Sequence, residues 1–74
     1  MEKIAVAFGR VVRRRRERLG FSQEEFADRA GIHRTYVSSI ELGKVQVSIA
    51  IAQQLADTLG APLSKIWQEI ERGK

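Results

Sequence analysis

The stretch at residues 22–43, which reads SQEEFADRAGIHRTYVSSIELG, constrains the fold of this chain more than any other segment. It begins with Ser22, and Glu25 follows three positions later, which is the pattern of a capping box at a helix start. Gly31 stands where a residue in the left-handed conformation ends that helix. A second short helix follows and ends at Gly43. The stretch therefore predicts two short helices joined by a tight turn.

The second predicted helix, residues 33–42, separates its apolar residues from its polar ones. Val37 and Ile40 fall on the side that faces the first helix. The other side carries one arginine and three small hydroxyl side chains, namely Arg34, Thr35, Ser38 and Ser39. Side chains of these types can hydrogen-bond the base edges that a DNA groove exposes. The helix is therefore a candidate for base readout.

A helix at about residues 2–18 is expected before this stretch, and it carries a run of arginines. Phe8, Val12 and Leu19 form its expected buried stripe. The segment 13–18 contains five arginines, which spread around the helix and so make no single basic patch. Two interpretations stay open. The run is a solvated helix face, or one or two of its arginines reach DNA phosphate.

Two further helices are expected after the stretch. Ser48 is suited to cap the first of them, and Pro62 is suited to the first turn of the second. The sequence shows no strand pattern, internal repeat or interdomain linker. It therefore predicts one all-α domain, residues 1–74, with helices at about 2–18, 23–30, 33–42, 49–59 and 62–71.

The inventory of reactive side chains argues against an enzyme. The chain has no cysteine, which excludes disulfides and thiolate metal ligands, and its single histidine is His33. We therefore expect no metal and no cofactor. Glu24 and Glu25 are adjacent carboxylates, but their place in the first turn of a helix is explained by the helix dipole. No Gly-rich phosphate loop or nucleophile–base arrangement is visible.

Hydropathy and charge indicate the cellular location of the protein and the kinds of partner that it binds. No apolar run approaches the roughly 20 residues of a membrane span, and no signal peptide opens the chain, so a soluble cytoplasmic protein is expected. The net charge is +4, and residues 1–44 hold ten Lys and Arg against six Asp and Glu. Residues 45–74 hold three of each. A basic front half and a neutral, apolar rear half indicate a polyanion on one side and a protein partner on the other.

Most of the chain, from Phe8 to Trp67, resembles the phage-repressor and Cro-like (XRE-type) helix-turn-helix superfamily. The matching pieces are Phe8-Gly9, Val12-Arg13, Arg16, Gly20 to Ala27, Gly31-Ile32, Val37-Ser38, Ile40-Glu41, Gly43, Ser48-Ile49 and Leu59-Gly60. The resemblance implies the compact five-helix, lambda-repressor-like DNA-binding fold. Within the superfamily, Gly31 to Tyr36 followed by Ile40-Glu41 is similar to controller proteins of restriction–modification systems.

The resemblance assigns roles to particular residues. Base readout falls to Arg34, Thr35, Ser38 and Ser39. Contacts with DNA phosphate fall to Gln23, His33, Tyr36, Lys44, Gln46 and Arg16. The matching Arg16 and Glu41 also imply a salt bridge that joins the first helix to the end of the base-reading helix.

Several of these roles have plainer alternatives. Gln23 is also explained as a solvated residue in the first turn of a helix, and Tyr36 as a tyrosine at the edge of the core. His33 is also explained as a neutral residue at the start of its helix. The loop before Ser48 departs from the superfamily, because Gln46 and Val47 stand where a basic residue and a proline are usual.

The last predicted helix raises the question of a partner. Leu63, Ile66, Trp67 and Ile70 recur at spacings of three and four residues. We expect a symmetric homodimer through this stripe together with Ile51, with the alternative that the stripe belongs to the core. In such a dimer two recognition helices about 34 Å apart would meet successive major grooves of a palindromic double-stranded operator.

The sequence therefore predicts a dimeric, sequence-specific DNA-binding transcriptional regulator of the restriction–modification controller type. With no second domain, no small-molecule ligand is expected. The alternative from another class is an antitoxin-type protein-interaction module for which DNA binding is secondary.

Overall fold

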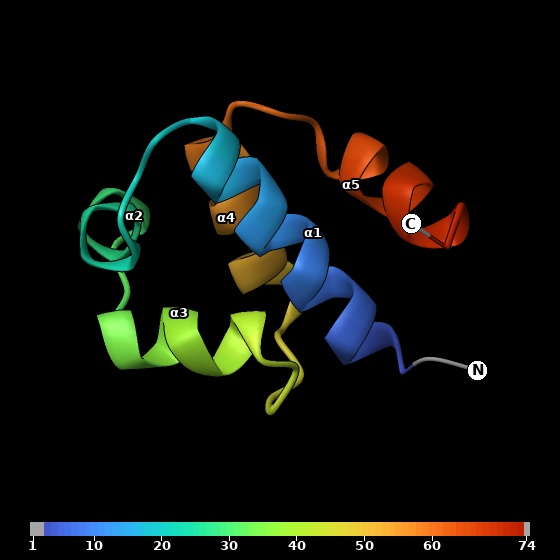
Figure 1. The fold of residues 1–74 in the computed structure, drawn as a ribbon, viewed down its shortest axis with the longest axis horizontal. Helices are drawn as coiled ribbons and strands as arrows, with labels where there is room; N and C mark the ends of the chain where they lie inside the picture. The colour runs from blue at the N-terminus through green and yellow to red at the C-terminus, as the bar shows by residue number, and fades with distance from the viewer. Residues whose placement is uncertain (1–2, 74) are drawn as a thin grey trace.

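The computed structural model describes residues 3–73, in which five helices follow one another without a strand. The helices are α1 (Ile4–Arg18), α2 (Gln23–Ala30), α3 (Arg34–Glu41), α4 (Ile49–Leu59) and α5 (Leu63–Glu71). The predicted all-α, five-helix class is confirmed (Figure 1), and the predicted bounds that fall on described residues differ from the observed ones by at most one residue. The first predicted helix was to begin at residue 2, which lies outside the described residues.

Helices α2 and α4 begin at serines whose side chains accept hydrogen bonds from the first turn. The Ser22 Oγ accepts from the Glu25 N–H at 3.0 Å, and the Ser48 Oγ accepts from the Ile51 N–H at 3.1 Å. The Glu25 carboxylate pairs with Arg29 at 3.2 Å instead of completing the expected capping box. At α2's end, Gly31 has φ 75°, the left-handed conformation that its position predicted.

Helix α1 is the central element, and Figure 1 shows it in front of α4. It packs against α3 on one side and α5 on the other, while α2 packs against α3 and α4. The core between them contains side chains with at most 1% of their surface exposed, among them Val11, Val12, Phe26, Val37, Ile40, Leu55 and Ile66. Every helix thus contributes to one core.

Gly9 allows α1 to lie directly on α3. A Cβ atom at this position would stand 2.1 Å from the Ile40 carbonyl oxygen and 2.9 Å from that of Glu41. No side chain fits there without moving backbone. The glycine therefore allows the close approach of α1 to α3, the predicted base-reading helix.

The buried stripe of α1 differs from the prediction at its C-terminal end. Leu19 is 49% exposed, whereas Arg16 is buried at 7%. Leu19 is the C-cap of α1, one residue beyond the end of the helix at Arg18. Near the end of α1 the buried side chain is therefore Arg16, which hydrogen-bonds inside the protein, and not Leu19.

The prediction for α5 is also corrected in part. Ile66 and Ile70 are 0% and 8% exposed and belong to the core, so they are not surface residues of a dimer interface. Trp67 remains 43% exposed, while Leu63 is partly buried. Ile51 is half-buried against the core. In the part of the chain that the structure describes, no helix has both the length and the apolarity to cross a membrane.

Candidate nucleic-acid interface

A buried ion pair joins α1 to the end of α3. Arg16 donates from Nε to the Glu41 Oε2 at 2.7 Å and from Nη2 to Oε1 at 3.1 Å. Its Nη1 donates to the Phe21 carbonyl at 2.6 Å, which also ties down the loop before α2. The hydrogen bond to Glu41 raises the pKa of Arg16, which favours the charged guanidinium. This bidentate pair holds three segments in fixed relation.

Gln23 joins the same network from the first turn of α2. Its Nε2 donates to the Glu41 Oε1 at 2.9 Å, and the residue is half-buried. The plain interpretation of a solvated side chain is therefore wrong for this structure. Because Glu41 orients the Gln23 amide, the start of α2 and the end of α3 are held together by one carboxylate.

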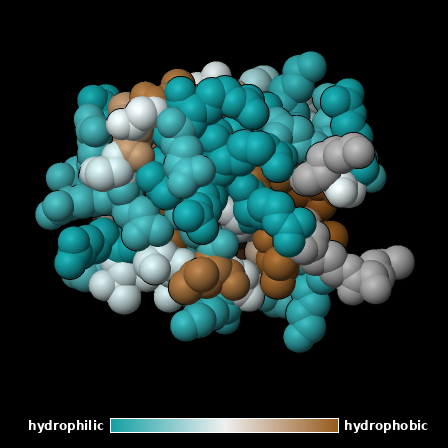
Figure 2. Space-filling view, in the orientation of Figure 1, coloured by the Kyte–Doolittle hydropathy of each residue, from teal (hydrophilic) through white to brown (hydrophobic). Residues whose placement is uncertain are grey.

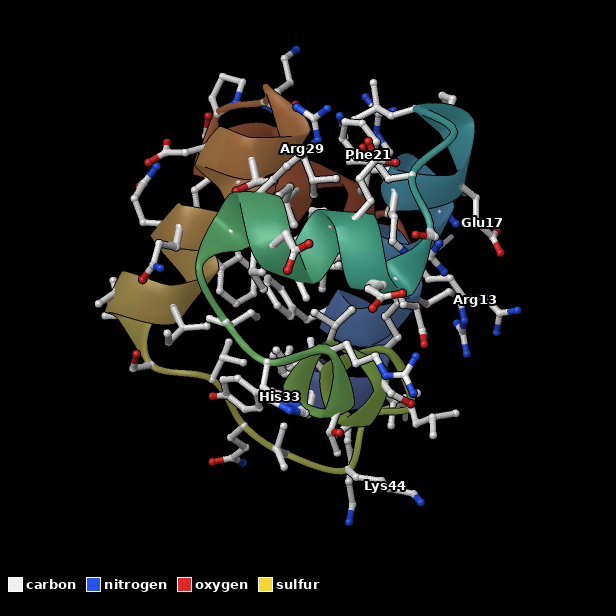
Figure 3. All side chains as sticks on the ribbon, turned by 90° about the vertical axis from the view of Figure 1, so that its left-hand side faces the viewer. Arg13, Glu17, Phe21, Arg29, His33 and Lys44 are labelled. Carbon is white, nitrogen blue, oxygen red and sulfur yellow. The ribbon has the colours of Figure 1, made fainter. Side chains whose placement is uncertain are left out.

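The predicted base-reading residues gather beside the start of α2. A surface cleft is lined by Ser22, Gln23, Glu24, Arg34, Thr35 and Ser38. Arg34 and Thr35 are exposed, and Ser38 and Ser39 are half-buried. Figure 3 looks along α3 with α2 above it, and shows His33 where α3 begins and Lys44 below. Ser39 does not line the cleft, so the structure brings together three of the four predicted residues.

The predicted phosphate contacts are distributed over several surfaces. The His33 Nδ1 accepts from the Thr35 N–H at 3.1 Å, so His33 is the N-cap of α3 rather than its first residue. Tyr36 is half-buried against the core, as a core-edge tyrosine would be. Lys44 is exposed just beyond α3, and its backbone N–H donates to the Ser39 carbonyl at 3.0 Å. Gln46 is exposed but lines a different, apolar groove.

The arginine run divides into residues with different partners. Arg14 donates to the Glu69 Oε1 at 3.0 Å, and Arg15 donates from Nε to Oε2 at 2.7 Å, which fastens α5 to α1. Burial disfavours the ionised Glu69, yet the hydrogen bonds from both arginines lower the pKa of its carboxyl below the usual value. The sequence analysis missed Glu69, because local spacing gives no sign of a partner more than 50 residues away.

The apolar groove lies between the start of α1, the loop before α4, and α5. Its lining residues are Ile4, Ala5, Phe8, Val45, Gln46, Val47, Ser48, Ile49, Ala52, Leu63 and Trp67. Ile49 is 84% exposed and Ile4 is 58% exposed. The face that carries α1 in Figure 2 is otherwise largely hydrophilic. Of the residues predicted for a dimer interface, Leu63 and Trp67 line this groove.

Comparison with known proteins places this geometry in a family. Residues 12–66 match the family model described as Helix-turn-helix, and the match covers α2, the turn and α3 completely. The chain belongs to the helix-turn-helix family. This confirms the resemblance drawn from the sequence, and with it the prediction of a DNA-binding regulator.

Relatives of this helix-turn-helix protein include control proteins. The chain is 38% identical over 73 residues to the control protein C.MunI of a Mycoplasma species, covering 97% of this chain and 99% of that one. The restriction-modification controller protein C.AhdI of Aeromonas hydrophila superposes with a TM-score of 0.81 at 34% identity, covering 84% of this chain and 90% of that one. The clp gene regulator ClgR of Corynebacterium glutamicum, at 24% identity, shares the fold with a TM-score of 0.93, over 97% of this chain and 77% of its own.

Proposed function

We propose that the protein is a sequence-specific transcriptional regulator of the restriction–modification controller type, which binds an inverted-repeat operator as a homodimer. The observation that carries the proposal is the Arg16–Glu41–Gln23 network. It fixes α3 against α1 and α2 while Arg34 and Thr35 stay exposed. Similarity to C.MunI and C.AhdI supports the controller assignment.

In this proposal α3 enters the major groove and Arg34 is the main base reader. A guanidinium can bridge O6 and N7 of guanine, which is worth about 1–3 kcal/mol of discrimination. Thr35 and Ser38 lie in the same cleft and offer hydroxyl groups to neighbouring bases or phosphates, and Ser39 extends the helix face. Because Arg34 belongs to the first turn of α3, it enters the groove with the end of the helix that usually contacts bases.

Phosphate contacts would hold α3 in register. Lys44 supplies an exposed ammonium group directly after α3. Gln23 stands at the positive end of α2, where backbone N–H groups favour an anion. Arg16, His33, Tyr36 and Gln46 were also predicted to contact phosphate. The side chains of Arg16, His33 and Gln23 already have internal partners, so we assign the main contacts to the Lys44 ammonium group and to the backbone N–H groups at the start of α2.

We assign the dimer interface to the apolar groove and its rim. Ile4, Ile49 and Trp67 each expose more than 40% of their surface around one groove, an arrangement that a second copy of the chain would cover. Leu63 also lines this groove. A two-fold axis through this face would repeat α3, and the two copies would need to stand about 34 Å apart to meet successive major grooves.

The mechanism of such a regulator is occupancy. Its position on the operator relative to the promoter decides between activation and repression, and its concentration decides how far the operator is filled. Neither step needs a small-molecule ligand. We propose that it acts in the cytoplasm, on double-stranded DNA.

Selection of binding sites from random duplex DNA tests the proposal. An enriched inverted repeat whose half-sites are about one helical turn apart is expected. Recovery of no preferred sequence would contradict it. Such a result, joined with co-purification of a tightly bound protein, would favour the antitoxin-type module.

A further inference from the structure

Glu17 interacts with two arginines of α1 through a single oxygen. Its Oε2 is 3.2 Å from the Arg13 Nε and 4.0 Å from the Arg16 Nη2. The Arg13 and Glu17 side chains are 58% and 54% exposed, whereas the Arg16 side chain is 9% exposed. The Glu17 carboxylate therefore lies at the surface, between the buried Arg16 and the exposed Arg13.

This point belongs to the side of the molecule where α2 begins. Arg16 connects it to the Phe21 carbonyl before α2 and to Glu41 at the end of α3. Figure 3 shows Arg13 and Glu17 at the same edge as the first turn of α2, whereas Arg29 lies at the top of that view. A DNA strand that passes α3 and the start of α2 would run close to Arg13.

The Arg13 guanidinium, which donates to the Glu17 carboxylate, could donate to a phosphate oxygen in the same way. Arginine binds carboxylates and phosphates with the same charge-assisted hydrogen bonds. An exposed ion pair such as Arg13–Glu17 contributes little to stability, so it exchanges readily for another anion. The carboxylate here has the charge and the contacts of a stand-in for phosphate.

We propose that Glu17 occupies the position of a DNA backbone phosphate and is displaced from Arg13 when DNA binds. This inference rests on the proposed DNA-binding face. Arg13 would then be one of the arginines of the run at residues 13–18 that reach phosphate, an alternative that the sequence left open without naming the residue. Because phosphates carry no sequence information, Glu17 weakens binding to every sequence alike.

The chain offers a matched control for this role. Glu25 and Arg29 form the same type of pair, four residues apart on a helix, with a distance of 3.2 Å and side chains 47% and 56% exposed. Glu25→Gln changes the net charge by the same amount as Glu17→Gln, and it does so in the first turn of α2, beside the proposed path of the DNA, so it is a stringent control for the gain from net charge alone. Comparison of the two variants separates displacement at one site from a general gain of positive charge.

The experiment measures binding to a duplex of random sequence by fluorescence anisotropy over a range of salt concentrations. Glu17→Gln is expected to bind up to about fivefold tighter than Glu25→Gln. The slope of log affinity against log salt concentration should be steeper for Glu17→Gln by up to about one. In an Arg13→Gln background, Glu17→Gln should gain no more than Glu25→Gln does. Unfolding temperatures confirm that the variants are folded.

Two results would overturn the inference. Equal gains for Glu17→Gln and Glu25→Gln would show that net charge alone is responsible, even if the protein still selects an operator. A gain for Glu17→Gln that survives the loss of Arg13 would show that Arg13 is not the group that Glu17 occupies. If the unmodified protein bound no duplex at all, the proposed function itself would be contradicted along with the inference.

Discussion

Arg16 and Glu41, 25 residues apart in the sequence, form the buried link between α1 and α3, the helix proposed to read bases. Both oxygens of Glu41 accept from the Arg16 guanidinium, and the carboxylate side chain is 2% exposed. Gln23 adds a third hydrogen bond to Glu41. The orientation of α3 therefore depends on a charge pair as well as on apolar packing.

Arg16→Met is expected to destabilise the protein by about 3–5 kcal/mol, because it leaves the Glu41 carboxylate buried without its cation. Urea unfolding followed by circular dichroism measures the change. Arg13→Gln, which breaks an exposed pair on the same helix, is the control and should change stability by less than about 1 kcal/mol. Similar losses for the two variants would show that the buried pair has no special role.

Glu69→Gln should reduce stability in a pH-dependent way. The folded-state pKa of Glu69 is lowered by Arg14 and Arg15, so its ionised form stabilises the fold above the ordinary pKa of 4.5. That contribution is lost as the pH falls through the lowered folded-state value. We expect a loss of about 1–2 kcal/mol at pH 7 and a smaller difference from the unmodified protein at pH 3. Urea unfolding at both pH values checks this, and a difference independent of pH would contradict it.

Ile49→Lys should shift the protein from dimer to monomer without unfolding it. Ile49 is 84% exposed on the rim of the apolar groove, so lysine is tolerated in one chain but places an unpaired charge in the proposed interface. Sedimentation velocity at micromolar concentration is the measurement. Leu19→Lys is the control, because Leu19 is also exposed and apolar but does not line the groove. If the unmodified protein sedimented only as a monomer, the proposed dimer would be contradicted.

The helix bounds were predicted well because several helix ends depend on residues close to them in the sequence. Ser22 and Ser48 accept hydrogen bonds from backbone N–H groups three residues later, and Gly31 takes the left-handed conformation that ends α2. The residue pattern alone therefore locates these helix ends. The His33 cap was missed because an imidazole is not among the usual capping side chains.

Partners that are distant in sequence were harder to predict. The Arg16–Glu41 pair came from family resemblance, and the Arg14 and Arg15 bonds to Glu69 were not foreseen. In α5, residues at spacings of three and four share one face. Which edge of that face meets the core depends on how the helix is rotated against its neighbours, and this rotation buries Ile66 while exposing Trp67. A linear pattern does not contain that angle.

The central claim is that α3 reads bases through Arg34, and binding of Arg34→Ala to a selected operator tests it most directly. Each base pair of a half-site is varied in turn, and Lys44→Ala, which removes a proposed phosphate contact, serves as the comparison. Arg34→Ala should lose about 1–3 kcal/mol of discrimination at one position in each half-site, whereas Lys44→Ala should weaken all sequences alike. If Arg34→Ala weakened every sequence equally and left the preference intact, α3 would not be reading bases through Arg34.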